Sequence, residues 1–162
     1  YGQARHATSA DLFVLPLSSV IGTAQAGIPA PFNTVGVTYP LEDKWAITPE
    51  EQLAIKTATD AYNTTIAAIA SANPNVALVD FKGLLEQSAT GIAFDQYTLT
   101  TSLVTGGLVS LDGVHLTGRG YALMANKIMA AMDTKFGSNF TTATGGLAKA
   151  DNHPTNYSPA LR

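Results

Sequence analysis

The stretch Ser110-Leu-Asp-Gly-Val-His-Leu-Thr-Gly-Arg-Gly-Tyr121 decides how the rest of the chain is interpreted. It places Asp112 three residues before His115, immediately ahead of a segment with helical periodicity. In this arrangement a carboxylate can fix the tautomer of the imidazole ring, which leaves the second ring nitrogen to take a proton from a nucleophile. Asp-Gly is also a common turn sequence, and a histidine beside a helix start is often structural. These residues alone leave both interpretations open, half of a hydrolytic triad and a plain turn.

The residues that follow predict a helix from Thr117 to about Phe136. Thr117 is a suitable N-cap, and Gly137 suits the left-handed position at the C-terminal end. Apolar residues recur at helical spacing and are expected to form one buried stripe. The stripe consists of Tyr121, Met124 or Ala125, Ile128, Met132 and Phe136.

A second helix is predicted from Thr48 to about Ala72. Thr48-Pro-Glu-Glu51 combines an N-cap, a proline in the first turn and a capping box, and Asn73-Pro74-Asn75 ends the helix. Its expected buried stripe consists of Ile55, Ala58, Tyr62, Ile66 and Ile69.

Two continuous apolar runs, Leu12 to Leu17 and Val76 to Val79, are typical of strands buried on both faces of a parallel sheet. Pro16 cannot donate to a strand ladder and is expected to end the first strand. Asp80 follows the second strand, where it is either a site candidate by position or, as we favour, the cap of a short helix over 81–87.

Residues 22–47 are predicted to form one long loop, because glycines and prolines punctuate them without any period. Loops of this length are often functional, so Phe32, Tyr39 and Trp45 are candidate substrate-binding residues that line an acyl or sugar pocket. Equally, these aromatic side chains could simply pin the loop to the domain. Residues 92–111 are predicted to be a hairpin-like excursion, and residues 138–162 an irregular C-terminal tail.

Composition sets outer limits on the protein class. A chain of 162 residues has the length of one domain, and 46% apolar with 13% charged residues indicates a globular protein. A formal charge of −3 gives no electrostatic reason to expect a nucleic-acid partner. The absence of cysteine excludes disulfides and thiolate metal sites, and three scattered histidines argue against any metal site. We therefore expect no metal and no cofactor.

The number of strands predicts an incomplete domain. Sheets usually have about five or six strands, and two apolar parallel strands would leave bare edges prone to aggregation. We therefore expect an N-terminal segment or a companion chain to complete the sheet. The chain also begins with Tyr1 rather than methionine, so we expect residues upstream of it.

The segment Ser110–Tyr121 resembles the last sequence block of the SGNH (GDSL-type) hydrolases, in which Asp-x-x-His supplies the acid and base of a triad. From about Tyr1 to Phe136, the chain resembles the C-terminal part of a Bacteroidetes group of large SGNH hydrolases, several of them predicted surface lipoproteins. The stretches that carry this resemblance are 10–22, 41–44, 48–52 and 110–115. Leu116 stands where the family often has proline, and the serine, glycine and Gly-x-Asn-Asp blocks are absent.

The resemblance implies an α/β fold, with residues 1–137 forming the C-terminal portion of a three-layer, flavodoxin-like parallel-sheet domain that is incomplete on its own. It also implies a carboxylic ester hydrolase in which Asp112 and His115 are the triad acid and base. Ser18, Ser19 and Ser110 lack the surroundings of a nucleophile, and Ser110 is expected to point away from the site. The nucleophilic serine and the oxyanion donors are therefore expected outside these residues, which leaves this chain inactive alone.

An acyl lipid or an acetylated glycan is the expected ester substrate, and the resemblance implies a location in the bacterial cell envelope, outer membrane-associated or extracellular. The alternative is a non-catalytic SGNH-like subunit with a binding or assembly role in an envelope complex.

Overall fold

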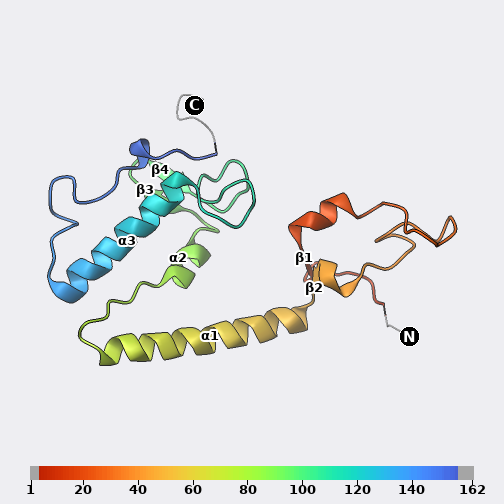
Figure 1. Ribbon diagram of the computed structural model, residues 1–162, viewed down its shortest axis with the longest axis horizontal. Helices are drawn as coiled ribbons and strands as arrows, with labels where there is room; N and C mark the ends of the chain where they lie inside the picture. Colours follow the sequence, from red (N-terminus) through yellow and green to blue (C-terminus); the bar gives the residue numbers. More distant parts are fainter. Residues whose placement is uncertain (1–3, 157–162) are drawn as a thin grey trace. The chain divides into compact units, whose positions relative to one another are not determined.

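The computed structural model describes residues 4–156, which divide into two compact units (Figure 1). The first unit extends to Thr65 and the second begins at Ile66, so helix α1 (Pro49–Ala72) contributes to both. Within the described residues, none of the helices combines the length and the apolar character needed to cross a lipid bilayer.

The first unit contains a two-stranded antiparallel sheet, in which β1 (Leu12–Phe13) pairs with β2 (Ala46–Ile47). The prediction of a buried parallel strand over Leu12–Leu17 is therefore wrong. The strand ends after Phe13, both its side chains are exposed, and the 3₁₀ helix η1 (Leu15–Ser19) follows. The fixed φ of Pro16 fits the first turn of a helix, and the amide of Leu17 already donates to the carbonyl of Val14 at 3.0 Å.

Residues 22–47 are built from short turns. Isolated bridges join Ala24 to Thr34 and Val35 to Tyr39, and the 3₁₀ helix η2 (Asp43–Trp45) leads into β2. Val35 is buried inside these turns, whereas Phe32 and Val37 are exposed. The segment is thus an irregular but internally hydrogen-bonded loop.

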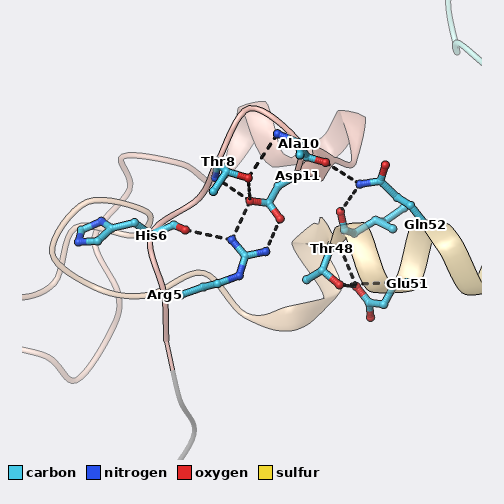
Figure 2. A network of polar contacts seen from close by, with 9 residues as sticks. Arg5, His6, Thr8, Ala10, Asp11, Thr48, Glu51 and Gln52 are labelled. Atoms are coloured by element: carbon cyan, nitrogen blue, oxygen red, sulfur yellow. Dashed lines mark hydrogen bonds and ion pairs between the residues drawn. The ribbon is translucent and has the colours of Figure 1, made fainter.

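A polar network anchors the start of the described chain to the beginning of α1 (Figure 2). Asp11, whose side chain is only 3% exposed, accepts both arms of the Arg5 guanidinium group together with the amide and hydroxyl of Thr8. The Arg5 guanidinium and the Thr8 donors hold the pKa of Asp11 well below its usual range. The Gln52 side chain donates to the carbonyls of Ala10 and Ile47 at 2.8 and 3.0 Å.

The predicted start of α1 is confirmed, but its predicted buried stripe is wrong. The Glu51 carboxylate accepts the amide of Thr48 at 2.8 Å, and the amide of Glu51 donates to Thr48 Oγ1 at 3.4 Å, as a capping box requires. The large apolar side chains of the stripe, Ile55, Tyr62, Ile66 and Ile69, are all more than half exposed. Periodicity correctly located the apolar face of the helix, but among residues 4–156 no segment covers that face.

The predicted strand over Val76–Val79 is also wrong. These residues are extended without pairing to another strand, and Val76 and Leu78 are exposed. The favoured role of Asp80 as a cap is confirmed, because its carboxylate accepts the amide of Gly83 at 2.9 Å at the start of α2 (Phe81–Gln87). A strand needs a neighbour as well as an apolar sequence, and the described chain offers none here.

The second unit has a core made by a hairpin, α2 and the first half of helix α3 (Gly118–Phe136) (Figure 1). Strands β3 (Ile92–Phe94) and β4 (Tyr97–Leu99) pair antiparallel, with Ile92 opposite Leu99 and Phe94 opposite Tyr97. The buried cluster comprises Leu84, Ile92, Phe94, Leu99, Leu108, Ala122, Leu123, Met124 and Ala150.

Both predicted ends of α3 are confirmed. Thr117 Oγ1 accepts the amide of Gly120 at 3.0 Å, and Gly137 adopts the left-handed conformation with a φ of 69°. The predicted buried stripe is only partly right, since Met124 is buried but Tyr121, Ile128 and Phe136 are exposed. The hairpin packs against the first turns of α3. The residues buried by this contact therefore include Ala122 and Leu123, which lie outside the predicted stripe.

The segment after α3 is tied to the helix along its length. The Asp133 carboxylate accepts four hydrogen bonds from Ser138, Phe140 and Thr141. The Asn126 side chain exchanges two 2.9 Å hydrogen bonds with the backbone of Ala148. The 3₁₀ helix η3 (Ala150–Asn152) then places the fully buried Ala150 in the core.

Residues 4–156 thus contain two separate two-stranded antiparallel sheets. The parallel sheet of a three-layer domain, which the resemblance implies, is not formed within them.

Candidate active site

The Asp112–His115 pair lies on a small closed loop immediately before α3. Val109 and Leu116 form an antiparallel bridge at its base, and the amide of Ser110 donates to the carbonyl of His115 at 2.7 Å. The amide of Gly113 donates to the carbonyl of Ser110 at 3.0 Å, and its positive φ of 72° lets the chain reverse there. The Asp-Gly pair therefore does form a turn, and this turn presents the acid and the histidine together.

The His115 ring contacts the Asp112 carboxylate directly. Its Nδ1 atom lies 2.7 Å from Asp112 Oδ2, while Oδ1 accepts the Ser110 hydroxyl at 2.6 Å and the amides of Val114 and His115 at 2.9 Å each. Both oxygens are therefore engaged, and these contacts restrict rotation of the carboxylate group. All of these donors lie within the six residues from Ser110 to His115, so the arrangement of the pair is set by contacts inside this loop.

These contacts keep Asp112 ionised. The Ser110 hydroxyl, followed by the Val114 amide and the His115 ring, holds the pKa of Asp112 below its ordinary range. An ionised carboxylate at Nδ1 favours the tautomer that carries its proton on Nδ1 and leaves a lone pair on Nε2. The side chain of His115 is 70% exposed, and Nε2 has no hydrogen-bond partner among residues 4–156. The ring can therefore act as a general base toward an incoming group.

The expected orientation of Ser110 is wrong. Its hydroxyl points to the acid of the pair and donates to Asp112, because the turn at Gly113 brings the two side chains to the same side. Ser18 and Ser19 lie in η1, where their hydroxyls donate to the carbonyls of Leu15 and Pro16. None of these three hydroxyls is directed to Nε2 of His115 by any recorded contact.

Elements outside the motif hold the base of the loop in place. Thr117 donates its amide to the carbonyl of Leu108 at 2.9 Å and its hydroxyl to that of Gly107 at 2.7 Å. Gly120 packs so closely that a side chain there would collide with the carbonyl oxygen of Leu108. The start of α3 therefore packs directly against Gly107 and Leu108, which precede the loop.

The buried Arg119 adds a second brace, which sequence reasoning missed. Its guanidinium group stacks 3.8 Å from the centre of the Tyr97 ring, and Nε donates to the carbonyls of Ala150 and His153 at 3.0 and 3.3 Å. Asn156 reaches further back and donates to the carbonyl of Val109 at 3.0 Å. No signal in the sequence pointed to this brace, because the two carbonyl acceptors lie more than thirty residues away, in a segment without periodicity.

The three aromatic candidates for substrate binding lie in the first unit. Tyr39 is half-buried and lines a cleft of about 740 Å³ together with Arg5, Phe13 and residues 36–43. Phe32 is 64% exposed, and the ring of Trp45 lies 5.2 Å from the ammonium group of Lys44; neither lines this cleft. Of the three, Tyr39 therefore lines this cleft, and the role of all three in binding substrate stays a prediction.

The family of this chain is shown by comparison with known protein families. The family model described as GDSL-like lipase/acylhydrolase matches residues 6–128, a range that includes the Asp112–His115 loop. No curated protein and no solved structure matches the chain. The matched region covers most of the chain, and the domain of this hydrolase family has an α/β fold. The chain belongs to the GDSL-like lipase/acylhydrolase family.

Proposed function

We propose that this chain supplies the acid and the base of a serine ester hydrolase. The observation that carries the proposal is the 2.7 Å contact between Nδ1 of His115 and an Asp112 carboxylate whose other oxygen accepts three hydrogen bonds. A histidine oriented in this way takes a proton at Nε2, as the triad mechanism requires. Membership of a lipase and acylhydrolase family supports ester hydrolysis as the reaction.

In the proposed reaction a serine hydroxyl attacks the ester carbonyl, and His115 takes the hydroxyl proton as the new bond forms. His115 then gives this proton to the departing alcohol, and Asp112 stabilises the imidazolium ion between the two steps. Water repeats the sequence on the acyl-enzyme and releases the acid. Donors of the oxyanion hole stabilise the tetrahedral intermediates.

The nucleophilic serine and the oxyanion donors belong, in this proposal, to sequence outside these 162 residues. The serines considered as nucleophiles have hydroxyls bonded elsewhere, at Asp112, Leu15 and Pro16. The exposed apolar faces of α1 and of Val76–Leu78 also support a completing segment, because uncovered apolar surface of this kind marks an interaction site. That segment or companion chain would add the parallel strands of a three-layer domain.

The proposed substrate is an acyl lipid or acetylated glycan of the bacterial cell envelope, and Tyr39 in its cleft is the best-placed aromatic residue for binding it. The competing function is a non-catalytic binding or assembly subunit. The long loop with its cleft suits such a surface, but the geometry of the Asp112–His115 pair favours hydrolysis.

Fluorophosphonate labelling of the full-length protein tests this proposal, followed by denaturing separation and mass analysis of each band. We expect a labelled serine outside residues 1–162, and a loss of labelling in the His115→Ala variant. His153→Ala is the matched control, because this half-buried histidine makes its hydrogen bonds within the described residues through its backbone: the carbonyl accepts from Nε of Arg119, and the amide donates to the carbonyl of Ala150. Unchanged labelling of His115→Ala would refute the role of the base, and no labelling of the wild type would favour the binding subunit.

A further inference from the structure

Among residues 4–156, the side chain of Ser110 has one hydrogen-bond partner, which is the acid of the pair. Its hydroxyl donates to Asp112 Oδ1 at 2.6 Å, the shortest of the three hydrogen bonds that this oxygen accepts. Such a short bond is typical of a hydroxyl donating to an ionised carboxylate. In the proposed reaction Asp112 and His115 are the acid and the base, and Ser110 takes no part in proton transfer.

The other two donors to Oδ1 come from one side of the loop. They are the backbone amides of Val114 and His115, which follow Asp112 in the chain and belong to the same turn. Ser110 precedes Asp112 and approaches through a side chain. The two amides therefore hold the oxygen from the backbone of the turn, whereas the Ser110 hydroxyl restrains rotation of the carboxylate group through a side chain.

The backbone fixes Ser110 itself. Its amide donates to the carbonyl of His115 at 2.7 Å, and its carbonyl accepts the amide of Gly113 at 3.0 Å. Ser110 is thus hydrogen-bonded both to Asp112, through its hydroxyl, and to His115, through its backbone amide. This closed arrangement links Ser110, Asp112 and His115 without any contribution from other elements.

We propose that Ser110 is a positioning residue, whose hydroxyl holds the Asp112 carboxylate in the orientation that presents Oδ2 to Nδ1 of His115. This inference rests on the proposed function for its catalytic consequence, but the hydrogen bond it describes can be observed without turnover. The low pKa of Asp112 agrees with a donor at Oδ1. Ser110 thereby acts through Asp112 and does not touch the substrate.

The test compares Ser110→Ala and Ser110→Thr in the full-length protein, with Ser138→Ala as the matched control. Ser138 also donates from its hydroxyl to an aspartate at 2.6 Å, but its partner Asp133 lies near the opposite end of the 19-residue helix α3. The control therefore removes the same type of bond far from the pair. Thermal unfolding of each variant establishes that it is folded.

With p-nitrophenyl acetate as the probe ester, we expect Ser110→Ala to lower kcat roughly ten-fold and to leave KM unchanged. Ser110→Thr retains a hydroxyl and should recover most of the lost turnover, while Ser138→Ala should match the wild type. A Ser110→Ala variant with wild-type kcat, or a Ser110→Thr variant as slow as Ser110→Ala, would overturn the inference. If His115→Ala retains full activity, the proposed function itself is refuted, and the catalytic consequence of the positioning role is refuted with it.

A spectroscopic readout separates the two proposals. In full-length protein labelled with ¹⁵N-histidine, the proton on Nδ1 of His115 should give a downfield resonance that is absent in His115→Ala. We expect Ser110→Ala to shift this resonance upfield or broaden it, and Ser138→Ala to leave it in place. An unchanged resonance in folded Ser110→Ala would overturn the positioning role whatever the esterase assay shows. If Ser110→Ala does not fold, the same comparison applies to Ser110→Thr, which must retain the wild-type resonance.

Discussion

Nδ1 of His115 lies 2.7 Å from Oδ2 of Asp112, and the backbone amide of His115 donates to the other oxygen of the same carboxylate at 2.9 Å. One aspartate therefore contacts both the backbone and the ring of the histidine. The hydrogen bond from the backbone amide fixes the position of His115, and the contact with Nδ1 fixes the orientation of its ring. This double contact is possible because the turn at Gly113 folds the chain back within three residues.

The Asp112→Asn substitution should lower ester turnover of the full-length protein by roughly 10²–10⁴-fold. An amide is nearly isosteric with the carboxylate, but it can present its NH₂ group to Nδ1 and stabilise the wrong tautomer of His115. Steady-state kinetics on p-nitrophenyl acetate measure the loss, which we expect in kcat. Asp60→Asn is the control, because this aspartate lies on α1 in an ion pair with Lys56. Turnover within two-fold of wild type for Asp112→Asn would contradict the assignment of the acid.

The stability of the chain should depend on pH through Asp133. Burial acts to raise the pKa of Asp133, but hydrogen bonds from Ser138, Thr141 and Phe140 outweigh it and hold the pKa below its ordinary value of 3.8. A lowered folded-state pKa means that the unfolded chain takes up the proton first as the pH falls. The stabilising contribution is therefore complete above that ordinary value and is lost progressively below it.

The measurement is the unfolding temperature of wild type and Asp133→Asn between about pH 6 and pH 2. We expect the variant to be less stable at the upper end, and the difference between the two proteins to shrink toward the lower end. A difference that stays constant over this range would show that Asp133 does not titrate as its contacts indicate.

The Arg119→Lys substitution should destabilise the second unit by about 1–3 kcal/mol. Lysine retains the charge but lacks the planar guanidinium group, which stacks on Tyr97 while Nε of Arg119 donates to two carbonyls. Thermal unfolding measures the effect, and limited proteolysis should show earlier cleavage within residues 138–156. Lys127→Ala, an exposed position on the same helix, should change stability by less than about 0.5 kcal/mol. Equal stability of the two variants would mean that the guanidinium group does not brace this segment.

Features of the fold that depend on contacts between residues close in sequence were predicted from the sequence, and features that depend on distant segments were not. Helix ends were predicted well, because the capping contacts of Thr48, Thr117 and Gly137 are made within a few residues. Helix faces were predicted poorly, because burial depends on what packs against them. The exposed Tyr62 of α1 belongs to an apolar stripe that the described chain leaves uncovered, and the exposed Tyr121 of α3 belongs to one that it covers only in part.

The strands failed for a related reason. Leu12–Leu17 and Val76–Val79 have the composition of buried parallel strands, but such strands exist only beside partners that the described residues do not provide. The candidate site was predictable at Asp112 and His115 because both lie in one local loop. The brace from Arg119 was not, since it depends on a segment thirty residues later that has no periodic pattern.

The close packing beneath the loop gives a final prediction, for the Gly120→Ala substitution. A Cβ at this position would collide with the backbone carbonyl oxygen of Leu108, which cannot move without disturbing the hydrogen bond from the amide of Thr117. We expect a loss of about 1–3 kcal/mol in unfolding free energy. Because Leu108 lies just before the loop that carries Asp112, turnover should fall as well.

Gly118→Ala is the matched control on the same helical turn. There an added Cβ would lie 3.1 Å from Cδ and 3.2 Å from the carbonyl oxygen of Pro154, so the neighbour needs to shift by only a few tenths of an ångström, whereas at Gly120 the Leu108 carbonyl oxygen would lie much closer to the added atom. Chemical denaturation of both variants, together with esterase assays of the full-length proteins, should rank Gly120→Ala as the more damaging change in stability and in kcat. The reverse order would place the constraint on the loop at the C-terminal segment around Pro154, and not at the contact between α3 and Leu108.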